Sequence, residues 1–215
     1  MRKFVGLLIV IVFGASAHAQ TSSRTLPISV GSSAQRTTTH IAFADAEFLL
    51  KPACGNSHIE KGAQVFLGKT ESHGPNVPPE LEKTLSIMVT VYTYDYCAGT
   101  YAYAWGRTTP RVFFLNGTDV ASVKEDVTVM DSTTGISRVV AVNILWQEDG
   151  LEENKGEDRN SHRVPTQKTM NYETSVWVHA QVSGSVMDGQ TEFMTGTQYG
   201  SISDRDESVM IVPAS

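Results

Sequence analysis

The longest alternating stretch of the chain, residues 85–108, constrains the fold more than any other feature. It reads LSIMVTVYTYDYCAGTYAYAWGRT. Successive side chains of a β-strand point to opposite faces, so the odd positions from Leu85 to Val91 form an apolar face and tyrosines gather on the other. Gly99 interrupts the alternation. We therefore expect a tight turn at Ala98 and Gly99 and an antiparallel hairpin.

The predicted hairpin places its aromatic side chains on one face. A turn at Ala98 and Gly99, or a four-residue loop from Cys97 to Thr100, pairs Tyr96 with Tyr101, Tyr94 with Tyr103 and Tyr92 with Trp105. Directly opposed residues of an antiparallel pair lie on the same side of the sheet. A slip of one residue would send the side chains of a whole strand to the opposite face. We therefore expect a ladder of six aromatic side chains.

The first 19 residues have the layout of a secretory signal peptide. Arg2 and Lys3 precede an apolar run from Phe4 to Phe13, and small residues lead to Ala19. The apolar run is much shorter than the roughly 20 residues that cross a bilayer. We expect cleavage after Ala19, a secreted or periplasmic protein, and no membrane span in the mature chain. Residues 20–40, rich in Ser and Thr, predict a flexible N-terminal arm, and residues 41–215 predict a single β-sandwich domain.

Charge and cysteine content narrow the function classes. The chain has a formal net charge of −6, and loss of the two bases of the signal peptide makes the mature protein −8. Nucleic-acid binding depends on clustered Lys and Arg, so we exclude it. Two cysteines, Cys54 and Cys97, predict one disulfide in an oxidising compartment. The alternative use of these cysteines is a zinc site with His58 and His73.

Turn and strand signals recur about every ten residues along the rest of the chain. Asn116 and Gly117 separate two apolar runs, which is a strong hairpin signal. Residues 136–146 and 172–182 read as strands, and the polar residues 147–169 between them predict a long loop. The pattern predicts an all-β protein, an antiparallel β-sandwich of about ten short strands, with a β-barrel as the alternative.

The aromatic ladder is the candidate binding site. Planar rings on an exposed sheet face stack on sugar rings, while neighbouring hydroxyl and carboxylate groups bind sugar hydroxyls. The candidate ligand-binding residues are Tyr92, Tyr94, Tyr96, Tyr101, Tyr103 and Trp105. The alternative is that a second sheet covers these rings, which then pack as core. We expect an exported, non-enzymatic binding or structural protein, with carbohydrate or a cell-surface protein as its partner and no cofactor.

A calcium-stabilised structural domain is a second hypothesis. The segment Glu148–Arg163 holds six carboxylates, and carboxylate oxygens are the ligands that Ca²⁺ prefers. Their spacing departs from the EF-hand pattern, and a solvated connector is the simpler interpretation. Asp204, Asp206 and Glu207 form a smaller acidic group that we interpret in the same way.

An extracytoplasmic hydrolase is the third hypothesis. Its site would use Asp95, Glu148 or Asp149 together with His162 or His179. The sequence contains no nucleophile elbow, P-loop or zinc-protease motif. We therefore assign no catalytic and no metal-ligating residue from the sequence, and we favour a protein without enzymatic activity.

Overall fold

A computed structural model describes residues 35–75, 77–78, 82–194 and 199–213. The predicted signal peptide and residues 20–34 of the predicted arm lie outside the described residues. The first strand begins at Gln35, so the last six residues of the predicted arm, 35–40, belong to a strand. This strand has an alternating burial pattern as far as Phe48, and such a pattern with a period of two is typical of a half-buried strand.

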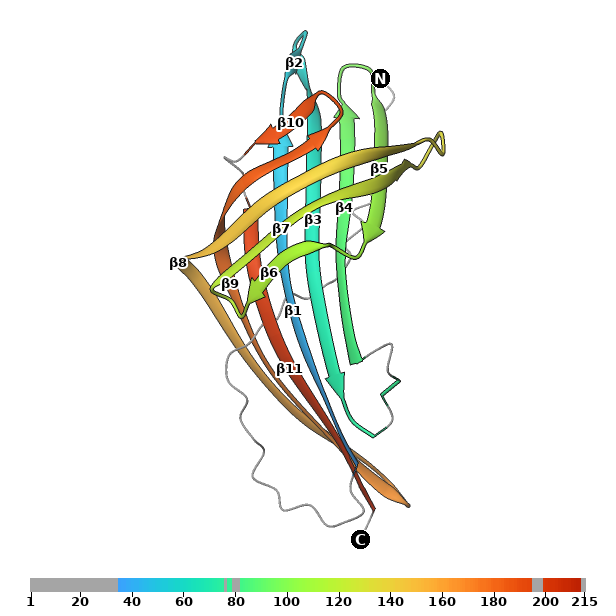
Figure 1. The fold of residues 1–215 in the computed structure, drawn as a ribbon, viewed down its shortest axis with the longest axis vertical. Coiled ribbons are helices and arrows are strands. Elements are labelled where there is room, and N and C mark those ends of the chain that lie inside the picture. Colours follow the sequence, from blue (N-terminus) through green and yellow to red (C-terminus); the bar gives the residue numbers. More distant parts are fainter. Residues whose placement is uncertain (1–34, 76, 79–81, 195–198, 214–215) are drawn as a thin grey trace, which may run out of the picture.

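Eleven strands make up almost all of the described chain (Figure 1). They are β1 (Gln35–Leu50), β2 (Ala53–Cys54), β3 (Ser57–His73), β4 (Lys83–Asp95), β5 (Thr100–Thr108), β6 (Val112–Asn116), β7 (Val120–Asp131), β8 (Ser137–Val164), β9 (Gln167–Asp188), β10 (Thr191–Met194) and β11 (Tyr199–Pro213). The part of the chain that the structure describes contains no helix long and apolar enough to cross a membrane.

The strands pair antiparallel in the order β1-β11-β9-β8-β7-β5-β4-β3, and β3 pairs again with β1. The short strands β2, β6 and β10 add to β3, β7 and β9. In the upper part of Figure 1 the ring is folded into two layers, with β7 and β8 crossing in front of β3 and β4. The predicted all-β, sandwich-like fold is confirmed.

The apolar core fills the space between these layers. Every second residue of the long strands points inward, and the layers meet through small and β-branched side chains such as Val65, Val89, Val127 and Val142. Such residues fit the pleated, half-buried surface of a sheet. Trp146 is the largest fully buried side chain, and its Nε1 donates a hydrogen bond to the carbonyl oxygen of Asp45 at 2.7 Å. A buried indole N–H is thereby satisfied.

The predicted loop at residues 147–169 is wrong. β8 continues to Val164 and β9 begins at Gln167, so the two strands form one long hairpin. Between residues 151 and 163 every side chain is exposed, on both faces of the hairpin. The segment therefore lacks the apolar alternation by which a half-buried strand is recognised, although its backbone pairs with β9.

Candidate functional site

The turn between β4 and β5 is fixed by Asp95 and by a disulfide. Oδ1 of Asp95 accepts hydrogen bonds from the backbone N–H groups of Cys97 and Ala98, at 2.9 and 2.8 Å. The N–H of Gly99, whose φ is 67°, donates to the carbonyl oxygen of Asp95 at 2.7 Å. Cys97 is bonded to Cys54, with a Cα–Cα distance of 6.3 Å. The predicted disulfide is confirmed, and it attaches the turn to the β2–β3 hairpin.

The predicted register of the aromatic hairpin is wrong by two residues. The structure pairs Tyr94 with Tyr101, Tyr92 with Tyr103, and Thr90 with Trp105. The cause is the turn, which begins at Tyr96 because Asp95 closes it. Each β4 residue therefore pairs with a β5 residue two positions earlier than predicted. A shift of two residues leaves every side chain on its original face, so the six aromatic residues still share one side of the sheet.

This shared side, the aromatic face, is open to solvent. Tyr96, Tyr101 and Trp105 are 54%, 48% and 48% exposed, and the other three rings are partly exposed. The second layer packs against the opposite side of β4, where Val89 and Val91 are buried. The rings are therefore not part of the core between the layers.

Most of the rings stack on one another in a column. The ring centroids of Tyr103 and Tyr101 are 5.6 Å apart, those of Tyr101 and Tyr94 4.2 Å, and those of Tyr94 and Tyr96 6.2 Å. His58 ends the column, with its centroid 4.8 Å from that of Tyr96. At 4.2 Å, with planes inclined by 21°, Tyr94 and Tyr101 stack face to face. These two rings present edges and hydroxyl groups to solvent more than free faces.

Trp105 differs from the tyrosines of the column. Among the described residues it has no aromatic ring partner, and 48% of it is exposed. Its indole face is therefore free to receive a planar apolar surface, such as one face of a sugar ring.

The ring of Tyr92 does not stack face to face in the column. It lies over Gly62 on the neighbouring strand β3 and meets Tyr94 edge-on. Its hydroxyl donates to Oε1 of Glu47 at 2.8 Å, and Nε2 of Gln64 donates to the same oxygen at 3.1 Å. A side chain at Gly62 would collide with the tyrosine ring, since an added Cβ would be 1.9 Å from Cζ of Tyr92. Burial and the bond to Glu47 raise the pKa of the Tyr92 phenol, which therefore stays protonated.

A row of four side chains crosses the aromatic face, and we call it the polar row. It consists of Trp105 on β5, Thr90 on β4, Gln64 on β3 and Glu47 on β1, each the direct pairing partner of the next. Three strand spacings make the row about 14 Å long. It offers one indole face followed by a hydroxyl, an amide and a carboxylate. Gln64 and Glu47 were missed in the sequence because their place beside Thr90 depends on the pairing of β1 with β3 and of β3 with β4, which no local pattern reveals.

The residues proposed for a hydrolase are only partly brought together. Nδ1 of His179 is 2.6 Å from Oδ2 of Asp149, which lies where the β8 register shifts. Asp95 caps the β4–β5 turn, and β3, β1 and β11 separate its strand from the strand of His179. His162 is exposed near the far end of β8. Of the residues proposed for the hydrolase site, the structure therefore places one carboxylate, and not two, beside a histidine.

The acidic segment of the calcium hypothesis is spread along the exposed part of the β8–β9 hairpin. Glu153 pairs with Lys155 at 2.6 Å, and Glu157 pairs with Arg159. Within the described ranges, the only group with metal-ligand spacing is Cys54, Asp95 and Cys97, and its two sulfurs are joined in the disulfide. Neither the calcium hypothesis nor the zinc alternative gains support from the described residues.

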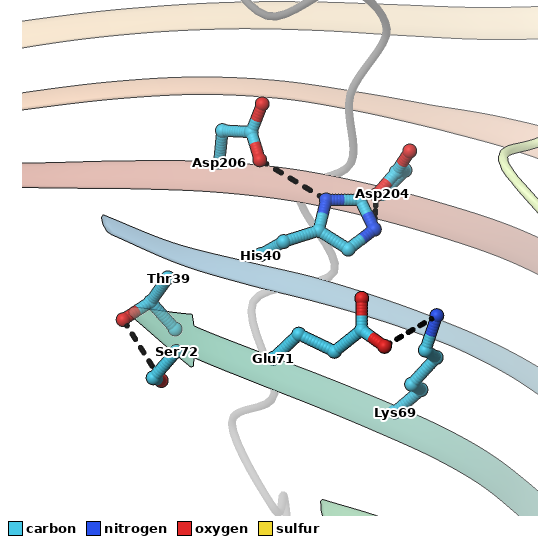
Figure 2. A network of polar contacts seen from close by, with 7 residues as sticks. All are labelled: Thr39, His40, Lys69, Glu71, Ser72, Asp204 and Asp206. Atoms are coloured by element: carbon cyan, nitrogen blue, oxygen red, sulfur yellow. Dashed lines mark hydrogen bonds and ion pairs between the residues drawn. The ribbon is translucent and has the colours of Figure 1, made fainter. Parts of the chain in front are cut away.

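A charged network lies beyond the apolar core, on the inward side of β1, β3 and β11 (Figure 2). Nε2 of His40 is 3.1 Å from Oδ1 of Asp204, and Nδ1 is 3.0 Å from Oδ1 of Asp206. On the adjacent strand, Nζ of Lys69 is 3.0 Å from Oε1 of Glu71. Asp204 is only 6% exposed, so the interpretation of this acidic group as solvated is wrong for that residue. Burial raises the pKa of Asp204 to about 6, against the opposing influence of His40.

Comparisons with known proteins leave the family open. No protein-family model matches the chain, and no curated protein matches it. One solved structure that resembles it, of a candidate AttH protein from Nitrosomonas europaea, is 13% identical and has a TM-score of 0.29. The alignment covers 82% of this chain and 52% of that one, so the chain spans about half the length of that protein. A likeness this weak carries no argument about fold or function.

Proposed function

We propose that this protein is an exported, non-enzymatic β-sandwich that binds glycan on its aromatic face. The observation that carries the proposal is the solvent exposure of the six aromatic side chains, three of them about half exposed. Contiguous apolar surface left in water is unusual in a monomeric domain and marks interaction sites. Two further features support export. The disulfide fits an oxidising compartment, and the first 19 residues have the layout of a signal peptide.

The proposed binding mode uses all four residues of the polar row, with Trp105 in a different role from the other three. The apolar face of one sugar ring stacks on the indole of Trp105. Sugar hydroxyls then exchange hydrogen bonds with Thr90, Gln64 and Glu47, which lie along the next strands. The carboxylate of Glu47 is already oriented by Tyr92 and Gln64, so little side-chain entropy is lost on binding.

Binding to a panel of soluble and insoluble polysaccharides tests this proposal. Trp105→Ala should weaken binding of any glycan found by at least about tenfold, equivalent to about 1.4 kcal/mol. Phe114→Ala is the matched control, since Phe114 is also an aromatic residue, 50% exposed, but lies on β6 in the other layer. Equal loss in both variants, or none in either, would remove the aromatic face from the site. Binding of a surface protein but of no glycan would redirect the proposal to a protein partner.

The contact between Asp149 and His179 keeps a hydrolase as the second candidate function. A carboxylate that orients an imidazole is one half of a nucleophile-activating arrangement. Ser201 pairs with His179 across β11 and β9, but its hydroxyl donates to Asp45. Turnover of aryl esters or aryl glycosides that disappears in His179→Ala would support this candidate, and the absence of turnover in the parent would dismiss it.

A further inference from the structure

A cavity of about 200 Å³ lies between the two layers, behind the sheet that carries the aromatic face. The cavity is open to solvent, and most of its lining is polar, with Thr93, Asp131, Asp188 and Thr191 among its residues. Val91 on β4, Ala102 on β5 and Phe193 on β10 form the smaller apolar part of the wall. Lys61 on β3 and Arg138 on β8 add charged groups. In Figure 1 this is the upper end of the molecule, where β10 lies beside the end of β9. The cavity is separate from the polar row, which lies on the opposite side of β3 and β4.

The charges around the cavity are paired with one exception. Nε and Nη2 of Arg138 donate to the two carboxylate oxygens of Asp188, at 2.6 and 2.9 Å. This bidentate arrangement occupies both groups. Oδ1 of Asp131 accepts hydrogen bonds from the N–H groups of its own turn, from Thr133 and Thr134. For the ammonium group of Lys61, the described part of the chain provides no ion pair or hydrogen bond.

Volume and polarity together define the class of ligand. A cavity of about 150 Å³ holds benzene, so by volume this one has room for one six-membered ring with a small substituent, and its polar lining favours a ligand with a polar group. The wall of Val91 and Phe193 suits an apolar ring, and an unpaired lysine suits an anion. We infer that the cavity binds a small aromatic carboxylate, with its ring against Phe193 and its carboxylate paired with Lys61. This inference does not rest on glycan binding: Tyr92 and Tyr103 of the aromatic face line the cavity, but no residue of the polar row does.

Benzoate and its neutral analogue benzamide are the probes, measured by calorimetry and by chemical-shift titration of the whole mature protein. We expect benzoate to bind at least ten times more tightly than benzamide. Lys61→Met should abolish this preference and leave benzamide binding unchanged. Lys124→Met, which removes an exposed lysine from β7, should retain the preference of the parent. A preference that survives in Lys61→Met would overturn the role of Lys61.

A second variant tests the cavity itself. Ala102 is exposed at the cavity wall, so Ala102→Phe should fill the space without disturbing the buried core. Both probes should lose binding in this variant, and glycan binding through Trp105 should persist. Failure of the parent to bind either probe, or shifts that map to residues outside the cavity, would overturn the inference.

Discussion

At the residue scale, Gly62 decides where Tyr92 lies. Alanine there would place a Cβ 1.9 Å from the tyrosine ring, so the ring must move and its 2.8 Å bond to Glu47 is lost. We expect Gly62→Ala to destabilise the protein by roughly 1–3 kcal/mol and to weaken glycan binding. Urea unfolding and calorimetry measure the two effects. Gly68→Ala is the matched control on the same face of β3, since the nearest atom, Oγ of Ser86, would be 4.0 Å away.

The control variant Gly68→Ala also has an expected effect on the free energy of unfolding. Glycine within a strand costs roughly 0.5–1 kcal/mol relative to alanine, so Gly68→Ala should be neutral or slightly stabilising. If the two variants unfold at the same urea concentration, the position of Tyr92 does not depend on Gly62.

Asp204 gives a pH-dependent prediction at the same scale. Its pKa in the folded protein is about 6, above the ordinary value of 3.8, chiefly because it is buried. The folded state therefore binds the proton more tightly than the unfolded state, so the contribution of Asp204 to the free energy of unfolding falls as pH rises from about 4 to about 6. The fall is on the order of 3 kcal/mol. Asp204→Asn should remove this part of the slope in urea unfolding measured at pH 4, 5, 6 and 7.

The charges around Asp204 set the control for this experiment. His40 on β1, Lys69 on β3 and Asp206 on the same strand as Asp204 face it, so the variant also removes a partner of His40. Asp126→Asn removes one negative charge from an exposed position on β7 and should keep the slope of the parent. An unchanged slope in Asp204→Asn would show that its burial carries no proton linkage.

At the element scale, the short strand β6 is fastened to β7 by an ion pair between Arg111, the residue before β6, and the buried carboxylate of Glu125. Glu125 points toward the core between Val123 and Val127 and is only 7% exposed. Its carboxylate accepts hydrogen bonds from the backbone N–H of Arg111 and, at 3.1 Å, from Nε of that residue. Glu125→Gln keeps the shape and removes the charge. Hydrogen exchange at residues 112–116 should then accelerate, while residues 127–130 of β7, paired with β8, keep their protection.

Asp126→Asn again serves as the control, since it changes the adjacent but exposed carboxylate. Equal exchange in β6 for parent and Glu125→Gln would contradict the fastening role, and would show that the five backbone pairs with β7 suffice to hold the strand.

The elements also show which parts of the fold can be read from a sequence. Hairpins with local turn chemistry, such as the one at Asn116 and Gly117, were predicted correctly because the signal lies within a few residues. The aromatic face was predicted although the register of the β4–β5 hairpin was wrong. The register differs by two residues, and a shift by an even number leaves each side chain on its original face. Residues 151–163 were missed because their strand has no buried face. The polar row was missed because Glu47 and Gln64 meet only through tertiary pairing.

At the scale of the whole molecule, the strands divide into a two-layered part and a single-layered extension. The apolar core occupies the two-layered part, where β8 pairs with β7 on one side and β9 on the other. Below it in Figure 1, β8, β9, β11, β1, β3 and β4 continue as a single sheet. The aromatic face, the disulfide and the cavity belong to the two-layered part. A binding surface on this packed part is held in place before ligand arrives, which lowers the entropic cost of binding.

This division predicts two levels of stability within one strand. Residues 140–147 of β8 pair on both sides, whereas residues 153–164 pair only with β9 among the described strands. The latter are exposed on both faces up to residue 163. Few apolar contacts resist opening of the second segment, so its amide hydrogens should exchange through local opening, far below the free energy of global unfolding. Hydrogen exchange resolved by peptide measures both segments in the same sample, so the first is an internal control. Equal protection in the two segments would mean that the extension unfolds only together with the core. In that case Gly62→Ala should speed exchange in residues 153–164 as much as in residues 140–147, whereas local opening predicts faster exchange only in residues 140–147.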